Sequence, residues 1–242
     1  MRIDRRGFLV TGLAASAAMA SSQLLAQEGS QQLGSSDNKT PSEIARQHGR
    51  QDLDVVFSFI KAGHGDFARV KEMVEQDPKL VFAAWDWGGG DWETALGGAS
   101  HTGHREIAKY LLAQGARIDC FCAAMLGERE GIEALLATNP SIANTKGPHG
   151  FTLLYHAAIS GDVAIAQALK PLLAPNAKDY DQALSSAARD GQLAMTSWLL
   201  KNGVTNPNLP DAYNKTPLAI ALEKGFSDVA EELRRNGGRE AI

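Results

Sequence analysis

The sequence predicts an all-α fold, a solenoid of about six helix-turn-helix repeats, and two observations lead to this prediction. The first is a series of glycines spaced by about 32 residues on average, a period typical of repeat proteins. The second is that each glycine separates a short alanine-rich segment from a segment whose apolar residues recur at helical spacing. The glycines are Gly65, Gly103, Gly127, Gly161, Gly191 and Gly225.

The clearest repeat spans residues 94–119. It contains a short helix of small residues, a turn at Gly103-His104, an amphipathic helix, and a stop at Gly115-Ala116. Glycine suits these turns because it readily adopts the left-handed backbone conformation that ends a helix. Two such helices cannot bury their apolar faces alone, so we expect the repeats to stack on one another.

Three stretches of the chain resemble the ankyrin-repeat family. Thr94-Ala-Leu96 and Thr216-Pro-Leu218 stand where ankyrin repeats carry a Thr-Pro-Leu turn. Residues 150–158 follow the longer family pattern Gly-x-Thr-Pro-Leu-His-x-Ala-Ala, although two of its positions differ. The resemblance covers roughly residues 53–237, and it implies an ankyrin-type α-solenoid.

The resemblance also implies β-hairpin fingers between consecutive repeats. We expect full fingers at about residues 84–93, 143–152 and 205–216, whereas the shorter glycine spacings leave the other fingers shortened or missing. The chain departs from the family pattern at Gly97 and Gly98, which replace the usual His and Leu.

Residues 1–26 are typical of a twin-arginine export signal. Arg5-Arg6 precedes a mild apolar run over residues 9–20, which at about a dozen residues is too short to span a bilayer. We expect residues 27–40 to form a flexible linker and residues 41–242 to form the ankyrin-repeat domain. The protein would then be periplasmic, with no stable membrane anchor after cleavage of the signal. An ordinary secretory signal with a chance arginine pair is the alternative.

Polar segments are expected to cap the two ends of the solenoid, as stacked repeats require for solubility. The N-terminal cap would be a helix from Ser42 to about Gln47, and the C-terminal cap would contain Arg234, Arg235 and Arg239.

Net charge argues against one class of partner, and cysteine spacing argues against a disulfide. The formal net charge of −4 gives no electrostatic footprint for nucleic acid, so we expect no nucleic-acid partner. Cys120 and Cys122 are one residue apart, a spacing that points them to different sides of a helix. We therefore expect two free cysteines that serve as small core residues.

The first predicted finger is rich in tryptophan. Within residues 84–93, three tryptophans stand beside three glycines and three acidic residues, and tryptophan is strongly enriched in binding hot spots. We predict that this finger contacts a partner. The alternative is that one or two of the tryptophans, best Trp92, cover the gap left by Gly97 and Gly98. The predicted contact residues are Trp85, Asp86, Trp87, Asp91 and Trp92, together with nearby His101.

A second candidate patch combines His149 and Phe151 on the next finger with Tyr155 on the following helix. In an ankyrin-type fold that helix lines the concave side, so we expect Tyr155 to face the groove. Ordinary packing between repeats is the alternative for this patch.

Four histidines fall into two pairs, His101 with His104 and His149 with His156. A metal site needs further ligands that converge on the same point, and the sequence does not reveal them. We therefore predict structural roles for the four histidines outside any partner contact, with no metal ligand and no cofactor. His104 would serve the Gly-His turn.

No catalytic motif stands out. The chain contains no Gly-x-Ser-x-Gly, no glycine-rich phosphate loop and no His-Glu-x-x-His, so we predict no catalytic residue and no enzyme activity. The resemblance implies a non-catalytic scaffold, adaptor or inhibitor in the bacterial periplasm, which binds an unidentified protein partner through its concave face and fingers. Two alternatives stay open. One is a small-molecule or metal-binding module that uses the tryptophan-rich finger and His101. The other is a hydrolase on the solenoid.

Overall fold

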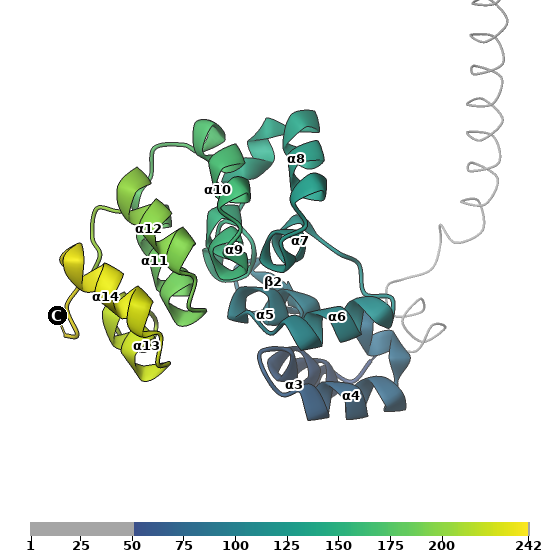
Figure 1. Cartoon of the computed structure of the whole chain (residues 1–242). Helices are drawn as coiled ribbons and strands as arrows, with labels where there is room; N and C mark the ends of the chain where they lie inside the picture. The colour runs from purple at the N-terminus through teal and green to yellow at the C-terminus, as the bar shows by residue number, and fades with distance from the viewer. Residues whose placement is uncertain (1–50, 242) are drawn as a thin grey trace, which may run out of the picture. The chain divides into compact units, whose positions relative to one another are not determined.

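Six consecutive pairs of α-helices make up the repeat domain in the computed structural model, which describes residues 51–241 (Figure 1). The predicted export signal, linker and N-terminal cap helix lie outside these residues. The helical fold class is confirmed. The pairs are α3 (Leu53–Gly63) with α4 (Phe67–Gln76), α5 (Ala95–Thr102) with α6 (Arg105–Ala113), α7 (Cys120–Leu126) with α8 (Arg129–Thr138), α9 (Leu153–Ser160) with α10 (Val163–Leu169), α11 (Ala177–Arg189) with α12 (Leu193–Asn202), and α13 (Pro217–Glu223) with α14 (Ser227–Arg235).

Local sequence explains where the first helix of a pair begins and ends. The threonine of each Thr-x-Leu motif is the N-cap: the Thr94 hydroxyl accepts a hydrogen bond from the Gly97 N–H, and the Thr216 hydroxyl accepts one from the Ala219 N–H. At the other end, α5 stops on Gly103, whose φ of 80° is the left-handed conformation that glycine adopts without strain. The start and end of these helices are therefore determined by residues of the same repeat.

The core lies between neighbouring repeats. The first helices of the pairs form a continuous row, in which α3, α5, α7, α9, α11 and α13 each pack on the next. Two apolar clusters fill the space behind this row, one centred on the first two repeats and the other on the later ones. Cys122 is fully buried in the first cluster, Cys120 is half-buried, and both are free thiols, as predicted. Among residues 51–241, no helix has the length and apolarity that crossing a membrane requires.

The fingers differ from one another. The first is the expected hairpin, in which β1 (Ala84–Asp86) pairs antiparallel with β2 (Trp92–Thr94). The second contains only the turn η3 (Pro148–Gly150) and an isolated bridge between Lys146 and Thr152, and the third contains no strand. The prediction of full hairpins there was wrong.

Proline and aspartate explain the difference between the fingers. Pro148 and Pro210 have no N–H to donate to a strand ladder. In the third finger, the Asp211 carboxylate accepts hydrogen bonds from the backbone N–H groups of Tyr213 and Lys215, in place of strand pairing. Short 3-10 turns complete the connections: η1 (Pro78–Phe82), η2 (Pro140–Asn144) and η4 (Lys170–Leu172).

Two turn glycines form a matched test of these turns. Gly191 and Gly225 have φ values of 68° and 79° at the same place in successive repeats, but an added Cβ meets the Phe226 ring at 2.7 Å only at Gly191. We expect Gly225→Ala to lower the free energy of unfolding by about 1 kcal/mol, the conformational cost of a left-handed alanine. Gly191→Ala should lose a further ~1 to 3 kcal/mol through overpacking. Urea unfolding of both variants checks this, and equal losses would contradict it.

Candidate functional site

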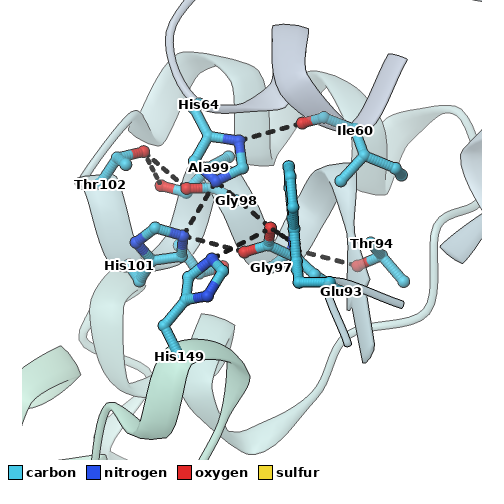
Figure 2. Close-up of polar contacts among 12 residues, drawn as sticks. Ile60, His64, Glu93, Thr94, Gly97, Gly98, Ala99, His101, Thr102 and His149 are labelled. Atoms are coloured by element: carbon cyan, nitrogen blue, oxygen red, sulfur yellow. Dashed lines mark hydrogen bonds and ion pairs between the residues drawn. The ribbon is translucent and has the colours of Figure 1, made fainter. Parts of the chain in front are cut away.

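Four side chains from separate parts of the chain converge beside α5 (Figure 2). His64 follows the end of α3, Glu93 lies on β2, His101 lies on α5, and His149 lies in η3. One ligand atom from each residue lies within 4.8 Å of the others. The cluster therefore joins the first repeat, the hairpin, the second repeat and the second finger.

The carboxylate of Glu93 is the centre of the cluster. The residue is only 1% exposed, and the Trp87 indole donates a hydrogen bond of 2.7 Å to Oε2. The Nε2 atom of His101 lies 2.8 Å from Oε1, whereas the Nε2 atoms of His64 and His149 lie 3.2 and 3.5 Å from Oε2. Three imidazoles therefore turn the same ring atom toward one buried anion.

Contacts on the far side of the rings fix this orientation. His64 Nδ1 lies 3.0 Å from the carbonyl oxygen of Ile60, and His149 Nδ1 lies 2.9 Å from an oxygen of Asp91. A carbonyl or carboxylate oxygen only accepts hydrogen bonds, so Nδ1 carries the proton in both rings. When these histidines are neutral, their Nε2 lone pairs therefore face the carboxylate.

The charges in the cluster are strongly coupled. Burial alone raises the pKa of Glu93, but the imidazoles of His101 and His64 more than offset this and hold that pKa far below its ordinary range. Burial lowers the pKa of His64, but the Glu93 carboxylate raises it by a larger amount, so the net shift is upward. Burial dominates at His101, whose pKa is lowered although Glu93 opposes the shift. Glu93 is therefore ionised, and positive charge is favoured on its His64 side.

Gly97 and Gly98 make room for the cluster. A Cβ at Gly98 would lie 2.8 Å from Nδ1 of His64, and a Cβ at Gly97 would lie 3.3 Å from Cγ of Glu93. The departure from the family pattern thus admits two side chains of the site. The alternative that Trp92 covers this gap was wrong, since Trp92 is 62% exposed.

The other two tryptophans of the hairpin anchor it to the domain. The ring centroids of Trp85 and Trp87 lie 5.2 and 5.7 Å from that of Phe57 on α3, in edge-on contacts. Asp86 accepts a hydrogen bond from the Gly88 N–H at the tip of the hairpin. The predicted contact residues therefore divide into anchoring residues and an outward-facing Trp92.

Asp91 connects the hairpin to the second finger. One oxygen accepts a hydrogen bond from the His149 backbone N–H, and the other lies beside the His149 ring. His149 has a φ of 57°, a left-handed conformation that is uncommon for a residue with a side chain. The two contacts from Asp91 hold His149 in this conformation, as expected where strain positions a functional side chain.

Tyr155 does not face an open groove, so that prediction was wrong. The residue is 7% exposed, and its hydroxyl donates to the backbone oxygen of His101 while accepting a hydrogen bond from Arg189. Phe151 stacks between Tyr155 and His101, with centroid distances of 4.2 and 5.3 Å. The alternative, packing between repeats, describes Tyr155 and Phe151, whereas His149 belongs to the cluster around Glu93.

The other two histidines within residues 51–241 lie outside the cluster. His156 is buried, and its Nδ1 lies 2.8 Å from the carbonyl oxygen of Thr152. His104 is exposed at the start of α6, where its backbone N–H closes the turn to Ala99. Both positions agree with the predicted structural roles.

Sequence reasoning missed His64 and Glu93, and with them the convergence of ligands that His101 and His149 were expected to lack. The one available signal was the pair of glycines in α5, because missing side-chain volume in a packed helix indicates that another group fills the space. Among residues 51–241, no serine, threonine or cysteine side chain is hydrogen-bonded to the four clustered side chains. The arrangement thus presents three imidazoles and one carboxylate, side-chain types that ligate metal ions.

An open pocket of about 300 Å³ borders the cluster. Trp92, Phe121 and Pro148 provide its apolar surface, and Lys146 and Asp119 provide charge. It lies between the hairpin and the second finger, so the outward-facing tryptophan forms part of its rim.

Helix pairs that are joined at a glycine-containing turn and stacked in a row define a helical repeat solenoid. Family models give the type of repeat: the model described as Ankyrin repeats (3 copies) matches residues 167–240, and the model described as Ankyrin repeat matches residues 91–122. The fold is an ankyrin-type α-solenoid, and the matches support an ankyrin-repeat protein. No curated protein matches the chain.

The buried His156 should make the fold acid-sensitive. Burial lowers its pKa from the ordinary 6.5 to about 4, so between these values the unfolded chain binds a proton that the folded chain does not. The free energy of unfolding therefore falls as pH drops through this window, by about 3 kcal/mol in total. We expect His156→Asn to be less stable at pH 7 but to lose this part of the acid dependence. Urea unfolding from pH 7 to pH 4 measures the difference, and parallel curves would contradict it.

Proposed function

We propose that this chain is a non-catalytic protein-interaction module, a scaffold, adaptor or inhibitor, of the bacterial periplasm. Ankyrin repeats generally mediate protein–protein interaction, and both family matches point to such repeats. The contact surface would comprise the hairpin finger and the concave side beside it. Fold alone does not determine function, so the proposal depends on a specific feature of this surface.

That feature is Trp92, which is 62% exposed on an anchored hairpin. A large aromatic side chain exposed to this extent is a common centre of binding energy. The hairpin is held by the edge-on contacts of Trp85 with Phe57 and by the hydrogen bond from Trp87 to Glu93. Because the finger is already ordered, less conformational entropy is lost when a partner binds.

The adjoining pocket supports the same conclusion. Its mixed lining of aromatic, proline and charged side chains suits an apolar side chain of a partner whose flanking groups are polar. The glycines at the hairpin tip, Gly88, Gly89 and Gly90, have no other atoms near the position of an added Cβ, so a partner can approach the backbone closely.

A pull-down from periplasmic extract tests the surface. We expect Trp92→Ala in the full chain to weaken capture of a specific protein at least tenfold, because truncating a hot-spot side chain removes about 2 kcal/mol or more. The matched control is Tyr213→Ala, which removes a side chain that is 83% exposed in the loop between α12 and α13. Equal capture by both variants, at unchanged thermal stability, would refute the role of the finger.

Export by the twin-arginine route has a test of its own. We expect Arg5→Lys with Arg6→Lys to hold the chain in the cytoplasm of a bacterium that has this route, because the arginine pair is the feature its receptor reads. Arg2→Lys is the control, since it preserves the pair. Cell fractionation measures the outcome, and continued export of the double variant would favour an ordinary secretory signal.

A further inference from the structure

We infer that His64, Glu93, His101 and His149 form a binding site for one divalent transition-metal ion of the zinc type. The inference does not depend on the proposed partner binding, because the ligand atoms face into the domain, whereas Trp92 faces outward. Three imidazole nitrogens and one carboxylate oxygen would complete a four-coordinate site.

The separations between ligand atoms suit such an ion. Tetrahedral zinc, with bonds of about 2.0 to 2.2 Å, places its ligand atoms roughly 3.3 Å apart. The Nε2 atoms of His64 and His101 are 3.2 Å apart; His64 Nε2 lies 3.2 Å from Oε2 of Glu93, and His101 Nε2 lies 2.8 Å from Oε1. His149 completes the group, and all four ligand atoms lie within 4.8 Å of one another.

The orientation of the rings suits a cation between them. Nδ1 of His64 and of His149 faces an oxygen that only accepts hydrogen bonds, so when these rings are neutral their Nε2 lone pairs face the buried carboxylate. Nitrogen lone pairs that converge beside a carboxylate are the arrangement that a bound zinc ion requires.

The hydrogen bonds made by the second ring nitrogens of His64 and His149 match those of metal-binding histidines. Such histidines almost always donate their second ring N–H to a carboxylate or backbone carbonyl, which fixes the ring and the tautomer. Asp91 provides this for His149. The Ile60 carbonyl provides it for His64 (Figure 2). Trp87 in turn orients the carboxylate of Glu93 through its other oxygen.

The ligand types determine the kind of metal. Calcium and magnesium prefer six or more oxygen ligands, and copper(I) prefers thiolates, whereas imidazoles with one carboxylate suit zinc. Four protein ligands would leave no position for a substrate, so the ion would act as a clamp. It would tie the end of α3, the hairpin, α5 and the second finger together.

Zinc binding by the purified full-length chain, prepared without a histidine tag and stripped by chelation, tests the site. We expect one Zn²⁺ per chain by elemental analysis and titration calorimetry. At a free concentration a hundredfold above Kd, the ion should raise the melting temperature by about 5 to 10 °C. His149→Ala should abolish stoichiometric binding, and it should fold because His149 is exposed. His104→Ala is the control, because the His104 ring contacts the His64 backbone but supplies no ligand atom to the cluster, so the variant should still bind one Zn²⁺.

A second pair of variants tests the outer contacts. Asp91→Asn should lower zinc affinity about 10- to 100-fold, the usual effect of losing an outer partner of a ligand histidine. Asp86→Asn is the control on the same hairpin, because Asp86 accepts its hydrogen bond from Gly88. The inference is overturned if the folded chain takes up no zinc, or if His149→Ala and His104→Ala bind it equally.

Discussion

A buried carboxylate must be compensated by positive charge or by hydrogen bonds, and this constraint organises the N-terminal half of the domain. Glu93 is 1% exposed, and no lysine or arginine pairs with it among residues 51–241. Three imidazoles and the Trp87 indole surround it instead. Because these groups come from separate repeats, the compensation of one charge fixes the hairpin against α3, α5 and the second finger. Removal of any one of them changes the environment of the rest.

The repeats make this convergence possible without taking part in its chemistry. Each helix pair contains its own turn glycine between its two helices, and the row of first helices sets the spacing from one repeat to the next. Loops on such a scaffold can vary freely, which is why functional residues concentrate there. His64 caps the end of α3, Glu93 lies on β2 and His149 lies in η3, whereas His101 alone lies on an α-helix. The rigid row thus brings three residues from the connections between helices to one residue of α5.

Helical repeats were predictable from the sequence because their signals are local. Turn glycines, threonine caps and alanine-rich first helices lie within a few residues of the structure they specify. The cluster was not predictable, because His64 and His101 are 37 residues apart and meet only through stacking. Gly97 and Gly98 were the local trace of the site. The sequence suggests a tryptophan as one candidate to cover this gap, whereas His64 and Glu93 fill the space. The hairpins predicted for the second and third fingers do not form, and the reason is local: proline has no N–H to donate to a neighbouring strand.

Alternation along β2 links the buried cluster to the exposed surface. Successive side chains of a strand point to opposite faces, so the inward position of Glu93 requires Trp92 to point outward. The cross-strand partners agree: Trp85 pairs with Glu93 on the inner face, and Asp86 pairs with Trp92 on the outer face. If the pairing register of β2 shifted by one residue, its inward-facing and outward-facing side chains would change places. The contacts that hold Glu93 in place therefore also set the direction of Trp92, and the inner cluster and the outer surface are two faces of one strand.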